Sequence, residues 1–167
     1  MYWSYDPLVA RNANFNLNIL GARPTEYVID MYGDTRSTLH HGLDTDRVIV
    51  KWQLDGPDVE CRAAGETPLA LPDTARDTPI VNPLPSDAGD TLHRSDPTSA
   101  WARISIPVDI DTLKSSHPDQ ARRWQQSVRT AFSLCLTNGY RVVGFVTSGE
   151  AAPFYVLTTE PWSGQEG

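Results

Sequence analysis

The chain has 167 residues, 40% of them hydrophobic, which is enough for one domain with a buried core. Its formal net charge of −7 argues against the large basic surface that binds a nucleic acid or an anionic membrane. No apolar run approaches the ~20 residues that cross a bilayer, and no basic-then-apolar leader is visible. Cys61 and Cys135 lie far apart in dissimilar contexts, which indicates free thiols. We therefore expect a cytoplasmic protein that binds neither nucleic acid nor membrane.

Residues 1–22 predict a strand followed by a helix. Aromatic residues dominate positions 2–5. Asp6 and Pro7 are typical of a helix start, because Asp accepts free amide hydrogens and Pro has none to satisfy. Apolar residues recur at helical spacing as far as Leu20, and Gly21 can take the left-handed conformation that closes a helix.

Two strands are expected after this helix. Residues 24–33 are rich in β-branched and aromatic side chains and end at a glycine turn. A polar, turn-rich stretch follows them. Residues 47–55 then alternate, which places Val48, Val50 and Trp52 on one face of a second strand.

Residues 55–100 differ in composition from the rest of the chain. Seven prolines lie among many Asp, Thr, Ala and Gly residues. Because proline lacks an amide hydrogen and fixes its own φ angle, we expect a long loop or insertion without a packed element. Short extended pieces are expected at 67–71 and 78–84.

Residues 101–167 predict a strand, a helix and a hairpin. Alternation over 101–106 places Ala102, Ile104 and Ile106 toward the core. Residues 109–116 predict one short helical turn.

The clearest helix signal covers residues 118–137, with Ser116 as the expected cap, Pro118 as a helix-start residue and Asn138-Gly139 as the stop. Strands at 140–148 and 154–160, joined by a tight turn, predict an antiparallel hairpin after it. One apolar stripe of the helix is expected in the core, and it consists of Ala121, Trp124, Val128, Ala131, Phe132 and Cys135.

These elements predict an α/β (α+β) fold: a mixed, largely antiparallel sheet with two main helices and a long Pro-rich loop. The expected segments are 1–54, the loop or insertion 55–100, and 101–167, whose elements pack on the same sheet. Strand–helix–strand–strand occurs at about 2–54 and again at about 101–159, and each helix ends in Gly. This echo is either a structural repeat or a coincidence of common elements.

Residues 12–22, NANFNLNILGA, resemble the late strand–helix–strand segment of GNAT-superfamily acyltransferases. In that segment a helix carrying an Ala ends in Leu-Gly plus a hydrophobic residue. The longer string at 3–22, followed by EYVIDMYG and DTDRVIVKWQL, looks like the C-terminal half of predicted GNAT N-acetyltransferases of unestablished substrate. Residues 106–145 look like the tail of the same group.

The resemblance implies transfer of an acyl group, most simply acetyl from acetyl-CoA as co-substrate, to an amine. The turn Q/R-x-x-G-x-G/A, which holds the CoA pyrophosphate in this superfamily, is absent from the sequence. The resemblance therefore implies the second half of such an enzyme. We expect it to pair with a missing N-terminal half, or to self-associate through the strand Tyr2–Tyr5. The alternative is a non-catalytic module, derived from a GNAT-like enzyme, that binds a ligand or a partner.

Candidate site residues come from the first helix and the strand after it. Many members carry a Tyr four residues before the helix-ending Gly as a general acid, but Leu17 stands there and cannot donate a proton. Tyr27 and Tyr32 are candidates for the acid by type, or are structural aromatics of the strand. Asn12 and Asn16 either line a cofactor-binding groove or lie on a solvated or partner-facing surface. No catalytic residue is assigned from the sequence.

His40 and His41 lie near Asp44 and Asp46, and these residue types bind metals. Neighbouring histidines point in different directions, however, and no further ligand spacing supports a site. We therefore expect an exposed polar loop and no metal.

Overall fold

The computed structural model describes residues 1–33, 43–53, 64, 71–82, 99–147 and 152–161. Their strands form two three-stranded antiparallel sheets. In spatial order the first sheet contains β1 (Tyr2–Tyr5), β3 (Arg47–Lys51) and β2 (Arg23–Val28), and the second contains β4 (Trp101–Ser105), β6 (Phe154–Thr158) and β5 (Arg141–Val146). The α+β class is confirmed, but the strands divide into two sheets where the sequence predicted one.

The helix of the first half starts later than expected. It consists of α1 (Ala10–Ala13) and η1 (Asn14–Ile19), the latter a π-helix with wider turns. Asp6 accepts the amide hydrogen of Leu8 at 2.9 Å, so it closes a turn before the helix and is not the N-cap. Gly21 has φ 67°, which confirms the predicted left-handed stop.

The second half contains α4 (Ile110–Ser116) and α5 (Pro118–Thr137). Asp109 caps α4 by accepting from the amide of Thr112, whereas the expected α5 cap, Ser116, instead bonds to the carbonyl of Thr112 within α4. All six residues of the predicted α5 stripe are buried, which confirms that prediction. Gly139 ends the helix with φ 79°.

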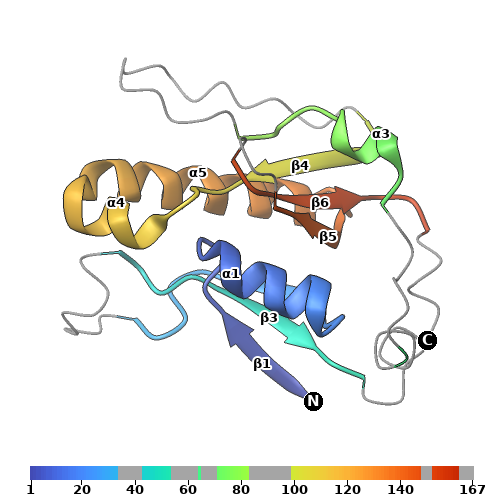
Figure 1. Cartoon of the computed structure of the whole chain (residues 1–167), viewed down its shortest axis with the longest axis horizontal. Coiled ribbons are helices and arrows are strands. Elements are labelled where there is room, and N and C mark those ends of the chain that lie inside the picture. Colours follow the sequence, from blue (N-terminus) through green and yellow to red (C-terminus); the bar gives the residue numbers. More distant parts are fainter. Residues whose placement is uncertain (34–42, 54–63, 65–70, 83–98, 148–151, 162–167) are drawn as a thin grey trace.

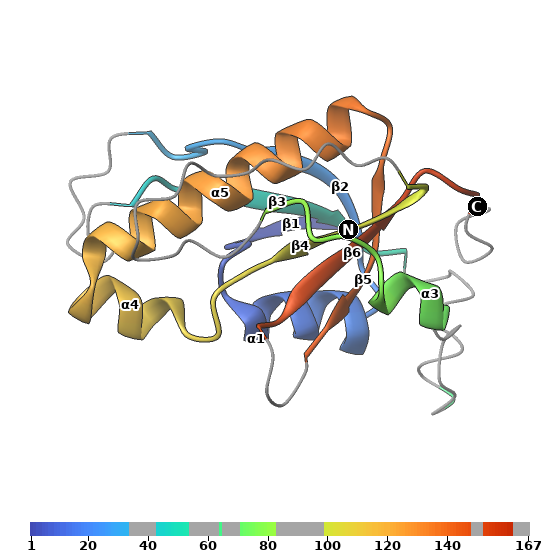
Figure 2. The same ribbon diagram turned by 90° about the horizontal axis from the view of Figure 1, so that it is seen from above.

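The two sheets enclose one hydrophobic core. Figure 1 shows the first sheet below the second, and Figure 2 shows α1 and α5 on opposite sides of the strands. Inner faces of both sheets and both helices contribute to a single cluster, which includes Val48, Val50, Ile104, Phe132 and Tyr155. Burial of Val48 and Val50 confirms the predicted inner face of β3.

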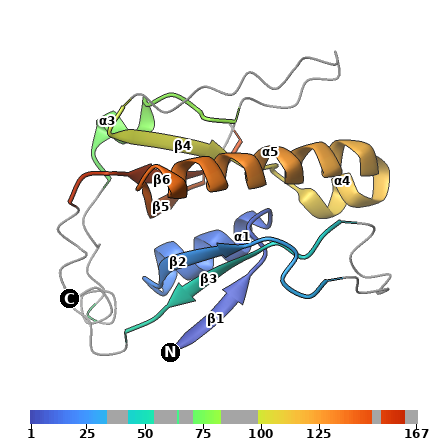
Figure 3. The same cartoon turned by 180° about the vertical axis from the view of Figure 1, so that it is seen from behind.

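Residues 71–82 correct the expectation of an unpacked Pro-rich segment. They contain the short helix α3 (Asp73–Arg76) and an isolated parallel bridge between Ile80 and Arg103 of β4. Leu71 and Ala75 pack against the face of the second sheet that points away from the first sheet (Figures 1 and 3). The apolar residues between the prolines explain this packing, because they give the segment surface to bury.

The two halves repeat one topology. Each runs strand, helix, strand, strand, and in each sheet the third strand lies between the first two. In each half a strand begins two residues after the helix-ending Gly. Each of these strands also has a register shift at the same place, at Pro24/Glu26 in β2 and Val142/Gly144 in β5. The echo in the sequence therefore corresponds to a repeat in the structure.

Candidate functional site

A pocket of about 460 Å³ lies where β2 of the first sheet contacts β5 of the second. This volume is typical of small-molecule sites. Residues 24–27 and 139–142 form two of its walls, and Phe132 and Leu136 of α5 form a third. Val48 of β3 also lines it. The wall is largely aromatic and aliphatic, with a few polar groups.

Two strand edges face this pocket. Met1 and Trp52 exchange both backbone hydrogen bonds, so every second residue of β3 counted back from Trp52, including Val48, directs its amide and carbonyl toward β1. Tyr27 of β2 lies opposite Val48, so the amide and carbonyl of Tyr27 point away from β3. The same alternation in the second sheet leaves those of Val142 pointing away from β6. The pocket therefore presents backbone donors and acceptors from both sheets.

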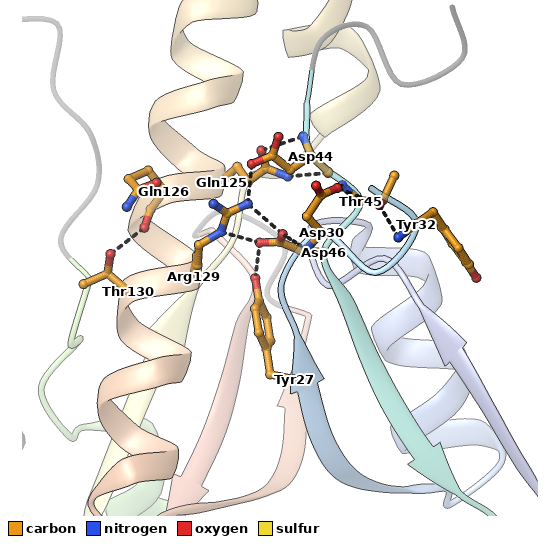
Figure 4. Close-up of polar contacts among 10 residues, drawn as sticks. All are labelled: Tyr27, Asp30, Tyr32, Asp44, Thr45, Asp46, Gln125, Gln126, Arg129 and Thr130. Carbon is orange, nitrogen blue, oxygen red and sulfur yellow. Dashed lines mark hydrogen bonds and ion pairs between the residues drawn. The ribbon is translucent and has the colours of Figure 1, made fainter. Parts of the chain in front are cut away.

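Tyr27 connects the pocket to a buried polar network (Figure 4). Its ring stacks on Phe132 with the centroids 4.7 Å apart, and its hydroxyl donates to Oδ2 of Asp46 at 2.8 Å. Arg129 of α5 binds both oxygens of the same carboxylate, with Nε at 2.9 Å and Nη2 at 2.7 Å. Nη2 also lies 2.7 Å from Asp44. Asp46 is only 3% exposed, so Arg129 and Tyr27 satisfy a buried charge.

Side chains around the ion pair fix the backbone that carries it (Figure 4). The amide of Asp30 donates to Asp46 at 3.0 Å, and the Asp30 carboxylate accepts from the amide and hydroxyl of Thr45. Gln125 clamps the backbone of Asp44, donating to its carbonyl at 2.7 Å and accepting from its amide at 3.1 Å. The network thus joins α5 of the second half to β2 and β3 of the first.

Three groups in the pocket wall and its polar network, Tyr27, Arg129 and Tyr140, have raised pKa values. Burial, with the carboxylate of Asp46 adding to it, raises the pKa of Tyr27 far above its ordinary value. Hydrogen bonds to Asp46 raise the pKa of Arg129. Tyr140, on the opposite wall, donates to the carbonyl of Ser99, and burial raises its pKa as well. None of the three is tuned to exchange a proton near pH 7.

The residues predicted from the sequence are only partly brought together. Asn16 is buried away from the pocket lining, where it accepts from Nε1 of Trp3 at 2.6 Å and donates to the carbonyl of Asn12 at 2.8 Å. Tyr32 is exposed, and Arg47 lies over its ring. The cofactor-binding role of Asn12 and Asn16 stays a prediction. Among the named candidates, only Tyr27 lines the pocket.

The pairing of Asp46 with Arg129 was not predicted, because 83 residues separate the partners. The sequence marks Asp46 only as a metal-type residue, whereas the structure uses its carboxylate to bind Arg129 and Tyr27. The sequence does contain one signal for a buried ion pair, because Arg129 directly follows Val128 of the buried apolar stripe of α5. His40, His41 and Cys61 lie outside the described residues.

No family model, curated protein or solved structure matches this chain. Within the described ranges, no helix is both long and apolar enough to cross a membrane. The same ranges contain no group of three His, Cys, Asp or Glu side chains placed to hold a metal ion.

Proposed function

We propose that this chain is a ligand-binding module of the GNAT acyltransferase type, incomplete as a catalyst by itself. The pocket between β2 and β5 carries this proposal, because it combines an apolar wall with backbone groups that a ligand can pair with. Phe132 and Leu136 offer apolar contact, while Tyr27 and Val142 offer amide donors and carbonyl acceptors.

This combination favours an extended ligand in which amides alternate with apolar groups. Such a ligand pairs with a strand edge as an added strand does. The pantetheine arm of acetyl-CoA has this chemistry, since it carries two amides separated by short carbon chains. The resemblance to acyltransferases and the pocket thus favour the same class of ligand.

Two features support binding without catalysis. Acetyl transfer to an amine needs a base for the ammonium and an acid for the departing thiolate. The hydroxyl of Tyr27 donates its hydrogen bond to Asp46, and Leu17 stands where many members of the superfamily have the acid. Without a phosphate-binding turn, the nucleotide end of CoA also gains little. We therefore expect acetyl-CoA to bind more weakly than the low-micromolar range.

The binding test compares acetyl-CoA with pantetheine, by calorimetry and by amide NMR of the full chain. We expect both ligands to shift the amide signals of Tyr27 and Val142. Replacing Leu136 by Trp fills the pocket and should abolish these shifts. Arg123→Trp introduces the same side chain on the exposed face of α5 and should leave them intact. The proposal fails if neither ligand shifts these signals, or if both variants behave alike.

A complete acetyltransferase is the second candidate, and the pocket amides are the observation that favours it. An N–H group at a strand edge can polarise a thioester carbonyl. The test measures thiol release from acetyl-CoA with a panel of amines. A rate above the uncatalysed background that Leu136→Trp removes would establish catalysis by this chain alone. We expect no such rate.

A further inference from the structure

The outer edge of β4 is occupied in this structure. The amide of Arg103 donates to the carbonyl of Pro79 at 3.2 Å, and its carbonyl accepts from the amide of Val81 at 2.8 Å. The side chain of Asn82 continues the pairing, because it exchanges two hydrogen bonds of 2.8 Å with the backbone of Ser105. This short segment runs parallel to β4, and the side chain of Val81 is buried.

The equivalent edge of β1 has no such cover among the described residues. The register of the two sheets makes Tyr2 and Ser4 the counterparts of Trp101 and Arg103. Because Met1 exchanges backbone hydrogen bonds with Trp52, alternation directs the amides and carbonyls of Tyr2 and Ser4 away from β3. The Tyr2 side chain is 63% exposed. An edge of this kind is a template for a further strand.

The outer faces of the two sheets also differ in charge. Leu71 and Ala75 cover apolar residues on the second sheet, among them Phe154 and Val156. On the first sheet the corresponding face is half-exposed, and alternation places on it Tyr2, Ser4, Arg23, Glu26, Val28, Arg47, Ile49 and Lys51. Three cations and one anion make this face basic in a chain of net charge −7.

Two of these cations have no anionic partner within the described part of the chain. Lys51 makes no ion pair there, and Arg47 lies over the ring of Tyr32 at 5.4 Å. Nε of Arg47 is buried and makes no hydrogen bond. A strand that brings carboxylates onto this face would therefore meet cations that are still unneutralised.

We propose that the outer edge of β1 binds an extended, acidic segment of a separate polypeptide. The segment lies parallel to β1, as residues 79–82 lie along β4, and its carboxylates lie on the face of the sheet that carries Arg47 and Lys51. A second copy of this chain is the poorer occupant, because pairing β1 with β1 would join two basic faces. No residue of β1 lines the pocket, so this binding edge is independent of the proposed function.

Synthetic peptides test this assignment with the full chain. The probes are two labelled peptides of alternating Val, one with Glu and one with Lys at the remaining positions. We expect the Glu peptide to bind at least tenfold tighter at low salt, with a preference that shrinks as salt is added. Hydrogen exchange should slow at the amides of Tyr2 and Ser4, and at no residue of β2.

Variants separate the edge from the face. Ser4→Pro removes an outward amide without touching the pairing to β3, so it should weaken binding at least tenfold at an unchanged oligomeric state, whereas Ser4→Ala should not. Lys51→Glu should lower the preference for the Glu peptide. The proposal is overturned if both peptides bind equally, or if hydrogen exchange slows at residues other than Tyr2 and Ser4. It is also overturned if the amides of Tyr2 and Ser4 are already protected in the free protein, or if a dimer forms without peptide and Ser4→Pro disrupts it.

Discussion

The two halves of the molecule share one arrangement of strands, yet the central strands of their sheets differ in sequence. The first half consists of residues 1–33 and 43–53, and the second consists of residues 99–147 and 152–161. In β3, Arg47–Lys51, buried and half-buried residues alternate. In β6, Phe154–Thr158, every residue is buried. The cause is the number of covered faces, since Leu71 and Ala75 pack on the outer face of the second sheet. An uninterrupted apolar run thus indicates a strand that is covered on both faces, whereas alternation of apolar and polar residues indicates a strand that is covered on one face.

The helices of the two halves differ for a local reason. The second half has the 20-residue α5, whereas the first has the short helix α1 that continues as the π-helix η1. Asn is a poor helix former, because its side chain competes for backbone groups. Asn16 bonds to the carbonyl of Asn12 and to Trp3, and Asn18 bonds to Asn14 and to the carbonyl of Phe145 in β5. The asparagines therefore tie the helix to both sheets.

The largest expected effect comes from cutting the link between the halves. Arg129→Ala leaves the carboxylate of Asp46 buried without its cation, so we expect a loss of about 3–5 kcal/mol in the free energy of unfolding. Urea denaturation measures this loss. Arg122→Ala on the same helix breaks an exposed pair with Asp119 and should cost less than about 1 kcal/mol. Equal effects of the two variants would show that the halves are held together by apolar packing alone.

A smaller effect tests the cover on the outer face of the second sheet, which the first sheet lacks among the described residues. A Cβ at Gly144 would lie 2.9 Å from Cδ1 and 3.4 Å from Cγ of Leu71, so Gly144→Ala should cost about 1–2 kcal/mol through overpacking. Combined with Leu71→Ala, the same change should become neutral or slightly stabilising, because glycine weakens a strand interior.

The two Gly144 measurements form a double-mutant cycle. The position in β2 that matches Gly144 in register is the control for this cycle. Glu26 already carries a side chain there, and no described residue covers it as Leu71 covers Gly144. Additive effects of Gly144→Ala and Leu71→Ala would contradict the packing of residues 71–82 on β5.

The sequence predicts those parts of the fold that local patterns encode. The α5 stripe, the alternation of β3 and β4, and the stops at Gly21 and Gly139 are all confirmed. The division into two sheets was not predictable, because it depends on β2 and β5 lying side by side without pairing. The packing of residues 71–82 was missed because Pro72 and Pro79 indicated a loop, although the extended piece expected at 78–84 contains the bridge of Ile80.

Only one part of the candidate site was accessible in the same way. Tyr27 stood out by residue type, but its partner Asp46 and the cation Arg129 come from distant segments. Pairing between segments so far apart depends on tertiary packing, which periodicity and capping rules do not contain. The proposed acyltransferase type likewise rests on the resemblance in sequence to the GNAT superfamily, and the binding experiments test it.

The smallest expected effect concerns the position four residues before each helix-ending glycine. Leu17 stands there in the first half and Cys135 in the second, and both side chains are buried. Burial raises the pKa of the Cys135 thiol to about 12. In the unfolded chain the thiol ionises at its ordinary, lower pKa, so above that pH the unfolded state binds fewer protons than the folded state. The resulting stability is therefore full below the unfolded pKa and declines as pH rises toward 12.

Urea unfolding at pH 7.5 and pH 9 measures this decline. Between these values we expect the wild type to lose under about 1 kcal/mol more than Cys135→Ala, which has no thiol to ionise. Buried tyrosines whose raised pKa values do not depend on Cys135, such as Tyr27 and Tyr155, contribute the same slope to both proteins and cancel in the difference. The folded wild type should also resist iodoacetamide at Cys135, since the reactive thiolate is scarce at the site. Rapid alkylation of Cys135 in the folded protein at pH 7.5 would show that this helix end opens readily despite the burial of its side chain.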